Sequence, residues 1–395
     1  MQRNVILLSN AYWPSIGGIE NSLRHLAIEA QEAGDNVEII VSDIGVPASD
    51  EDRLATVIDG IKVSRYPIAP FSHALFKPFN IVASSWQLYR LMKSKFHEQP
   101  NAIVVARFHF CAVAAILAGF ASVRYLVPSI VSNQYRGEKS NEEAFLTKLK
   151  RYSFIALHSL VQKKALQRCK NFVFSETMRM QCMGLAKNKA EDYMLTKPGV
   201  DQSRFCLAGL QQRIALRRKL SLPEDIPLVL FVGRFVKAKG VDLLIEAMSK
   251  VATNCHLVLV GGGDERPAFI THIKTLGLTD KVTIVDPLRT VEDYYRCADI
   301  FVMSSRYEPL GQTLLEAFSS GLQVVAFNRN SGVNTATEEL GMNNFVHYSK
   351  SLSGDALAVA VDKTLNKLNE EKRNNASKAA FEKFSWQKLY ASLVD

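Results

Sequence analysis

Short β-branched runs alternate with longer helical patterns along almost the whole chain of 395 residues. Two neighbouring parallel strands need a crossover between them, usually a helix, so this alternation is typical of parallel sheets covered by helices. The pattern predicts an α/β protein, and the length is enough for two domains with separate cores. In the first half we expect strands near residues 5–8, 37–41, 102–105, 126–131 and 172–175, and helices near 19–33, 80–96, 112–121 and 142–169.

The pattern breaks and restarts near the middle of the chain. Residues 221–227 contain two prolines and lead directly into a new strand at 228–232. The same order of strand, turn and helix then continues, with strands expected at 256–260, 282–285, 300–303 and 323–326. We therefore predict two doubly wound, Rossmann-like domains facing a deep cleft, an N-terminal domain of residues 1–205 and a C-terminal domain of residues 206–379. The aromatic side chains of a last helix, about 380–395, need a surface to bury against, and the first domain would supply one.

The charge of the chain favours an anionic partner. Lys and Arg total 48 against 39 for Asp and Glu, which leaves a formal net charge of +9 at pH 7. A basic balance suits a nucleotide, phosphate, anionic lipid or nucleic acid, and charge alone does not choose among them. The six cysteines lie apart, without a C-x-x-C pair or a Cys/His cluster, so neither a disulfide framework nor a zinc site is expected.

No stretch of the sequence is typical of a signal peptide or a membrane span. The longest apolar stretch, 111–123, is shorter than the roughly 20 residues that a bilayer-spanning helix needs. We expect a cytoplasmic protein with at most peripheral membrane contact. The region 142–170 is both basic and rich in large apolar side chains, which fits a solvated helix face and an interfacial helix on an anionic membrane equally well.

Several glycine-containing turns follow predicted strands, at the edge where parallel α/β sheets bind ligands. Gly17 and Gly18 precede the first helix, and Gly261 and Gly263 follow the strand 256–260. Glycine lets the backbone approach a phosphate or a base closely, and a helix N-terminus favours an anion. The same glycines are also what a tight strand-to-helix turn needs for conformational reasons alone.

Two cations follow the strand 228–232. Arg234 comes directly after Gly233, and Lys239 lies at the entry of the next helix. Two positive side chains beside free backbone N–H groups suit a diphosphate, whereas either cation alone would be an ordinary surface residue.

The segment 307–317 gives the strongest indication of a ligand site. Pro309 and Gly311 keep Glu308 in a loop, whereas Glu316 falls two turns into the helix that begins near Gly311. A carboxylate has several acceptor sites and is a natural partner for the 2′- and 3′-hydroxyls of ribose. The alternative is a capping acid followed by a glutamate on the helix surface.

Glu308 and Glu316, with seven residues between them, resemble the E-x7-E element of retaining GT-B glycosyltransferases of family 4, the glycosyl transferases group 1 type. The other motifs occur in that family's order along almost the whole chain. The resemblance implies that Arg234 and Lys239, with Gly233, hold the donor diphosphate and that Glu316 holds the ribose. It further implies that the transferred sugar contacts Glu308 and the backbone of Leu310 and Gly311. The donor would also lie beside the glycine turns, which contain Gly17, Gly18, Gly261 and Gly263.

His109 follows the strand 102–105 and is similar in position to a histidine that the family places near the donor sugar. On the sequence alone, a single histidine at a strand end is more often structural. The resemblance implies that it acts in catalysis together with Glu308, Arg234 and Lys239.

Some residues depart from the family pattern. Leu322 stands where a proline is usual, the late glycine-rich turn is reduced to 330–332, and Asn133 and Gln134 stand where relatives often have another histidine. The triplet 50–52, Asp-Glu-Asp, nominally matches the metal-binding D-x-D of another glycosyltransferase fold. It does not follow a hydrophobic strand, so we interpret it as a solvated loop and expect no metal and no other cofactor.

The resemblance, together with the motifs above, implies a retaining, metal-independent glycosyltransferase that moves a sugar from a nucleotide-diphosphate donor, by default a UDP-sugar, to a hydroxyl acceptor. A glycan or lipid-linked acceptor of cell-envelope polysaccharide or lipopolysaccharide biosynthesis would fit the basic region 142–170. An epimerase or a phosphorylase on the same fold is one alternative. A non-catalytic basic binding protein is another, but no motif typical of nucleic-acid binding supports it, and no nucleic-acid partner is expected.

Overall fold

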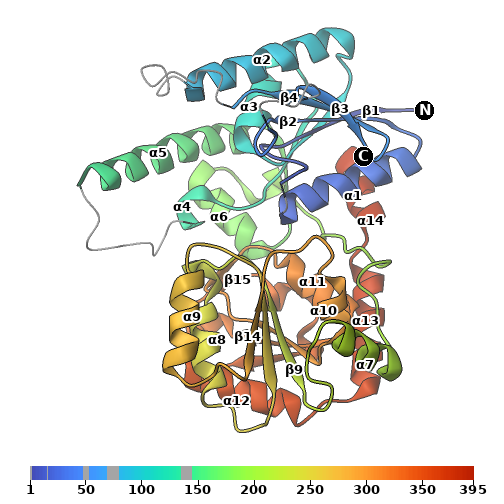
Figure 1. The fold of residues 1–395 in the computed structure, drawn as a ribbon. Helices are drawn as coiled ribbons and strands as arrows, with labels where there is room; N and C mark the ends of the chain where they lie inside the picture. The colour runs from blue at the N-terminus through green and yellow to red at the C-terminus, as the bar shows by residue number, and fades with distance from the viewer. Residues whose placement is uncertain (1, 16, 48–52, 69–79, 135–144) are drawn as a thin grey trace. The chain divides into compact units, whose positions relative to one another are not determined.

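The computed structural model describes residues 2–15, 17–47, 53–68, 80–134 and 145–395. The chain forms two compact units, one of Met1–Lys197 with Trp386–Asp395 and one of Pro198–Ser385. Both are layered α/β structures, as the alternating sequence pattern predicts (Figure 1).

The first unit is built on one sheet with the strand order β3-β4-β2-β1-β5-β6-β7-β8. Neighbouring strands run parallel except in the antiparallel hairpin β3–β4. Strand β1 is almost entirely buried because helices cover both faces of the sheet. The strands are β1 (Asn4–Leu8), β2 (Asn36–Ser42), β3 (Ala55–Ile58), β4 (Ile61–Tyr66), β5 (Ile103–Ala106), β6 (Val123–Leu126), β7 (Lys170–Val173) and β8 (Tyr193–Leu195).

Two hydrophobic clusters lie on opposite faces of this sheet, because successive side chains of a strand point to opposite sides. One face is covered by α2 (Asn80–Glu98), α3 (His109–Ala118), α5 (Phe145–Arg168) and α6 (Glu176–Ala186). The other is covered by α1 (Gly18–Glu32) and by the last helix of the chain, α14 (Trp386–Val394) (Figure 1). The short helix α4 spans Val131–Gln134.

Helix α14 buries its aromatic side chains in the first unit. The Trp386 ring stacks on His25 at 4.9 Å, and the Tyr390 hydroxyl donates to Asp35 Oδ2 at 2.7 Å. The units divide after Lys197 and after Ser385, which corrects the boundaries at 205 and 379 expected from the sequence. The reason is packing. The segments 198–205 and 380–385 contribute side chains to the core of the second unit, namely Val200, Phe205, Ala380 and Phe384.

The second unit contains a parallel sheet with the order β11-β10-β9-β12-β14-β16. A separate two-stranded ladder joins β13 (Tyr307–Glu308) to β15 (Asn334–Thr335). The strands of the main sheet are β9 (Leu228–Val232), β10 (His256–Val260), β11 (Val282–Val285), β12 (Ile300–Met303), β14 (Gln323–Phe327) and β16 (Val346–Ser349).

Helices again cover both faces of this sheet, and each layer encloses its own hydrophobic cluster. One layer consists of α8 (Val241–Met248), α9 (Arg266–Thr275) and α12 (Gly354–Leu365). The other consists of α7 (Leu210–Lys219), α10 (Glu292–Cys297), α11 (Gln312–Ser319) and α13 (Glu370–Lys383).

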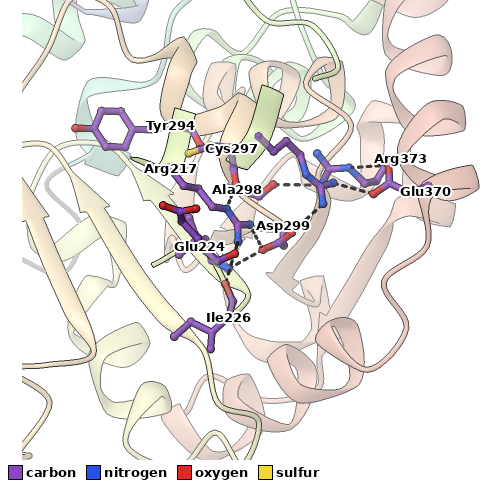
Figure 2. Close-up of polar contacts among 11 residues, drawn as sticks. Arg217, Glu224, Ile226, Tyr294, Cys297, Ala298, Asp299, Glu370 and Arg373 are labelled. Atoms are coloured by element: carbon purple, nitrogen blue, oxygen red, sulfur yellow. Dashed lines mark hydrogen bonds and ion pairs between the residues drawn. The ribbon is translucent and has the colours of Figure 1, made fainter. Parts of the chain in front are cut away.

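Helix α7 is fixed to the amino end of the second sheet by a buried ion pair. Arg217 Nη2 lies 2.6 Å from Asp299 Oδ2, and that carboxylate also accepts from the Leu228 backbone at 2.7 Å (Figure 2). Arg217 further donates to backbone carbonyls of Glu224 and Ile226 in the linker segment, at 3.2 and 3.1 Å. This cluster therefore anchors the start of β9, whose other end leads into the candidate site.

The described part of the chain contains no helix that is long and apolar enough to cross a bilayer.

Candidate functional site in the second unit

Three loops leave the carboxyl ends of neighbouring strands in the second sheet and carry most of the predicted donor residues. The first runs from Gly233 to Gly240 after β9, the second follows β10 at 261–265, and the third joins β12 to α11. Because β10, β9 and β12 are adjacent, these loops meet at one edge of the sheet.

The first two loops are bonded to each other through their backbones. The Phe235 N–H donates to the Gly262 carbonyl at 2.7 Å, and the Glu265 N–H donates to the Phe235 carbonyl at 3.1 Å. Gly261 and Gly263 both have φ of +150°, and a Cβ at either would collide with the backbone of the first loop. The structure thus gives these glycines a conformational reason, as the sequence alternative allowed.

The third loop fixes the short helical turn Lys237–Lys239. The Arg306 N–H donates to the Ala238 carbonyl, and the Ser304 hydroxyl donates to the Lys239 carbonyl, both at 2.9 Å. The Arg306 guanidinium also forms two bonds with the Asp242 carboxylate, at 2.8 and 2.7 Å. Burial alone would raise the pKa of Asp242, but these bonds outweigh it and lower the pKa below its ordinary value.

This connection brings Lys239 and Glu308 together. Lys239 Nζ is in direct contact with Glu308 Oε2, and the other oxygen, Oε1, accepts from the Gly311 N–H at 3.2 Å. The Glu308 backbone is held in the β13–β15 ladder and accepts from the Ala336 N–H at 3.0 Å. A nearly buried carboxylate is thus placed between an ammonium group and the loop that starts α11.

Gly311 begins α11 in the left-handed region, with φ of +80°, which favours glycine. The Gln312 side chain donates to the Gly199 carbonyl at 2.9 Å and so ties the first residue of the helix to the segment at 198–201. Leu310 lies in the turn between Glu308 and Gly311. The first N–H groups of a helix lack a carbonyl partner four residues earlier in the helix, and in α11 that of Leu314 donates to the Gly311 carbonyl at 2.8 Å.

Arg234 is exposed, and its side chain makes no ion pair or hydrogen bond with any residue that the structure describes. Its side chain is therefore available to an anion. The Lys239 ammonium is in contact with Glu308, so the two cations differ in their surroundings.

Glu316 is the fifth residue of α11, just past its first turn, and is buried. Its Oε2 accepts from the Tyr295 hydroxyl at 2.8 Å. Burial raises the pKa of Glu316 to about 7, against the lowering effect of Tyr295 and Arg204. Glu316 does not bond to Glu308 or Lys239 within the described chain. Tyr295 was not among the predicted residues, and the sequence contains no signal that would join it to a glutamate on the next helix.

His109 and the first glycine turn belong to the other unit. Gly17 and Gly18 begin α1, with Gly17 in an extended conformation. His109 is the first residue of α3, and its Nε2 lies 3.0 Å from Nδ1 of His158 on α5. Burial and the neighbouring His158 lower the pKa of His109 to about 3, so its imidazole is neutral at pH 7. His158 is a second residue that the sequence reasoning missed.

The residues that depart from the family pattern have ordinary structural partners. Leu322 is fully buried in the core of the second unit, and Asn133 donates to Gln181 Oε1 at 2.9 Å. Gly332 ends a short helical turn with φ of +85°. The Gln134 side chain and the acidic triplet 50–52 lie outside the described residues.

Comparison of the sequence with protein families matches residues 212–383 to the family described as glycosyl transferases group 1. An uncharacterized glycosyltransferase of Methanocaldococcus jannaschii is 28% identical over 247 residues, which is 61% of this chain and 62% of that protein. A lipopolysaccharide core biosynthesis glycosyltransferase of Rhizobium meliloti is 37% identical over 110 residues, 28% of this chain and 32% of that protein. The matches thus span less than two thirds of these relatives.

Solved structures match over nearly the full chain. Sucrose-phosphate synthase from Thermosynechococcus elongatus has a TM-score of 0.80 at 20% identity, covering 99% of this chain and 97% of that one. WaaG, a glycosyltransferase involved in lipopolysaccharide biosynthesis, has a TM-score of 0.73 at 18% identity, covering 98% of each. These likenesses confirm the predicted two-domain α/β class. The chain therefore has the GT-B fold, and its residues 212–383 match the glycosyl transferases group 1 family, in agreement with the resemblance seen in the sequence.

Proposed function

We propose that this protein transfers a sugar from a nucleotide-diphosphate sugar to a hydroxyl acceptor, with retention of configuration. The observation that carries the proposal is the contact of Lys239 with Glu308, beside the first N–H groups of α11, within a glycosyl transferases group 1 domain. Retention of configuration is carried over from the E-x7-E resemblance.

The charges of the site suit a departing diphosphate. In the proposed complex Lys239 exchanges part of its contact with Glu308 for a phosphate oxygen, and the exposed Arg234 supplies a second cation. Both would then stabilise the negative charge that grows on the leaving group. Glu308, released from Lys239, accepts from hydroxyls of the transferred sugar, while the backbone at Leu310 and Gly311 supplies donors. Glu316 accepts from the ribose.

We propose that this charge stabilisation needs no metal ion, since Arg234 and Lys239 supply it. Transfer should then continue at an unchanged rate in excess EDTA. A loss of transfer that added Mg²⁺ or Mn²⁺ restores would contradict this part of the proposal.

A UDP-sugar is the proposed donor. A solved structure of Anabaena HepE, with a TM-score of 0.72 to this chain, is described as a complex with UDP-glucose, and at 17% identity the likeness extends only to the fold. A thermal-shift panel of nucleoside diphosphates and their sugars identifies the base and the sugar, because a ligand that binds the folded state raises the melting temperature.

The function is tested with labelled donor and an acceptor panel, using Lys239→Ala and Glu308→Ala in the full chain. We expect roughly a 100-fold loss of transfer in each, because a group that stabilises transition-state charge is removed. Lys237→Ala is the matched control, since Lys237 lies in the same turn and its side chain is exposed. Near-normal transfer in both site variants would contradict the proposal, and conversion of the donor without any acceptor would indicate an epimerase instead.

We also propose that His109 contributes to catalysis as a neutral imidazole. Its Nε2 is occupied by His158, which leaves Nδ1 as the nitrogen available for a further hydrogen bond. His109→Ala should reduce turnover, and an unchanged rate would remove it from the site.

We propose a glycan or lipid-linked acceptor of envelope polysaccharide or lipopolysaccharide synthesis, reached by peripheral contact of α5 with the cytoplasmic face of an anionic membrane. Helix α5 contains six basic and no acidic residues. Leu149, Tyr152 and Leu160 share one of its faces and are 52%, 60% and 58% exposed. Lys163 and Lys164 follow one turn later, so the face combines apolar area with positive charge, which suits an anionic lipid surface.

Sedimentation with vesicles tests the membrane contact. We expect binding to phosphatidylcholine vesicles that contain phosphatidylglycerol and little binding to phosphatidylcholine alone. A Lys163→Glu/Lys164→Glu double variant should lose binding, whereas Lys187→Glu/Lys189→Glu, with the same change of charge elsewhere in the first unit, should retain it. Equal binding by both double variants would contradict a role for α5.

A further inference from the structure

The carboxylate of Glu316 is held by one side chain from a neighbouring helix. The Tyr295 hydroxyl of α10 donates to Glu316 Oε2 at 2.8 Å, and the other oxygen, Oε1, has no hydrogen-bond partner among the residues described. One oxygen is thus anchored inside the protein while the other keeps its acceptor sites for a ligand.

The Tyr295 side chain is closely packed. Its ring is fully buried, with Phe205 packed edge-on at 5.3 Å and Phe301 stacked at 5.7 Å. A buried tyrosine hydroxyl needs a hydrogen-bond partner, and here that partner is the Glu316 carboxylate. Burial raises the pKa of Tyr295 well above its ordinary value, so the hydroxyl stays a neutral donor at every working pH.

The charged groups around Glu316 come from two elements. Helix α10 contributes Glu292 together with Tyr295, and the segment before α7 contributes Asp201 and Arg204. Arg204 is bonded to Glu292 at 2.6 Å, so its positive charge is shared between the two acids. Tyr295 is therefore the one group of these that bonds Glu316 directly, and its hydrogen bond favours the ionised carboxylate.

We propose that Tyr295 is a positioning residue for the donor: its hydroxyl favours the ionised form of the Glu316 carboxylate and orients it so that it can accept from the vicinal hydroxyls of the donor ribose. The inference rests on the proposed function, because it assigns Glu316 to the ribose. It adds that donor affinity depends on a contact made by a residue that does not itself touch the donor.

The test compares Tyr295→Phe with Tyr294→Phe in the full chain. Both substitutions remove one hydroxyl from the same helix, but no hydrogen bond joins the Tyr294 hydroxyl to the described residues, and in Figure 2 the Tyr294 ring points away from the Arg217 cluster. The dissociation constant of UDP, or of the nucleoside diphosphate that the thermal-shift panel selects, is measured by calorimetry from pH 6 to 9.

For the wild type we expect affinity to rise with pH through a midpoint near 7, as Glu316 ionises. In Tyr295→Phe the midpoint should move upward by about one pH unit, and affinity at pH 7 should fall roughly fivefold, with a smaller deficit at pH 9. The KM for the donor should rise in parallel with the dissociation constant of the nucleotide, while kcat changes little. Tyr294→Phe should follow the wild type.

Glu316→Gln separates failure of this inference from failure of the proposed function. If Glu316→Gln binds the nucleotide as tightly as the wild type, the proposed donor site is wrong. If Glu316→Gln weakens binding but Tyr295→Phe changes neither the affinity nor its pH midpoint, Tyr295 is not a positioning residue. Should Tyr295→Phe fail to fold, the full chain made with 3-fluorotyrosine, whose hydroxyl is a stronger hydrogen-bond donor, should show the Glu316 midpoint moved downward, and an unchanged midpoint would overturn the inference.

Discussion

Arg306 and Asp242 form an ion pair with two hydrogen bonds, at 2.8 and 2.7 Å, that joins the loop after β12 to the first turn of α8. Neither residue is among the predicted donor contacts. The same loop continues into Glu308, and α8 follows directly after Lys239, so the pair sets how these two site residues approach each other. The geometry of the charged site thus depends on a bond outside it.

Arg306→Ala should therefore lower transfer more than it lowers stability. We expect roughly a tenfold loss of kcat/KM, because small displacements of charged groups are costly in a site that depends on orientation. The free energy of unfolding should fall by only about 1 kcal/mol, since both side chains are partly exposed. Arg329→Ala, which breaks the partly exposed pair with Glu339 in the same unit, is the control and should leave transfer unchanged. Parallel losses of activity in both variants would refute the positional explanation.

The buried pair of Arg217 and Asp299 should contribute to stability instead. Asp299→Asn leaves the Arg217 guanidinium buried without its partner, and we expect the free energy of unfolding in urea to fall by about 3 kcal/mol or more. Glu224→Gln breaks only the exposed pair with Arg218 and should leave the free energy of unfolding nearly unchanged. A cost for Asp299→Asn no greater than that of Glu224→Gln would show that the cluster in Figure 2 does not anchor α7.

Acid should destabilise the protein through His109. Its pKa is about 3 in the folded state against an ordinary 6.5, so below pH 6.5 the unfolded chain binds a proton that the folded chain does not. Stability present above pH 6.5 is then lost as the pH falls, with a slope of about 1.4 kcal/mol per pH unit from this one group. In His109→Gln the slope of the unfolding free energy against pH, measured between pH 6 and 4, should be smaller by about this amount. In His97→Gln, a change at an exposed position, the slope should equal that of the wild type. Identical slopes for all three proteins would contradict the burial of a neutral His109.

The sequence predicted the second unit better than the first. The bounds of β9, β10, β11 and β12 agree with the expected ranges, because a parallel strand buried on both faces is a continuous apolar run. In the first unit β6 begins three residues earlier than expected, and the hairpin β3–β4 was not anticipated. Strand β3 is half-exposed at the sheet edge, so its residues lack the apolar run that identifies a buried strand.

The site was predicted as a set of residues and not as a set of contacts. Motif spacing identified Glu308, Lys239 and Glu316, but the bond between Lys239 and Glu308 joins residues 69 positions apart. Likewise His158 lies 49 positions from His109. Such pairs depend on strand order and loop conformation, and local periodicity contains no information on either.

Glu316 should cost the protein stability, as expected of a charged group buried for function. Its folded pKa of about 7 lies above the ordinary 4.5, so the folded chain holds a proton that the unfolded chain releases between these values. Stability from this group is therefore present below pH 4.5 and is lost as the pH rises through 7, by up to about 3 kcal/mol. Glu316→Gln, which has no charge to bury, should be more stable than the wild type at pH 8 by an amount of this order and nearly equal to it at pH 4.5, while binding the nucleotide more weakly. Glu371→Gln, on the exposed first turn of α13, should show no such difference. A Glu316→Gln protein that is less stable than the wild type at pH 8 would contradict this prediction. It would mean that interactions other than the Tyr295 hydrogen bond offset the cost of burying the Glu316 carboxylate.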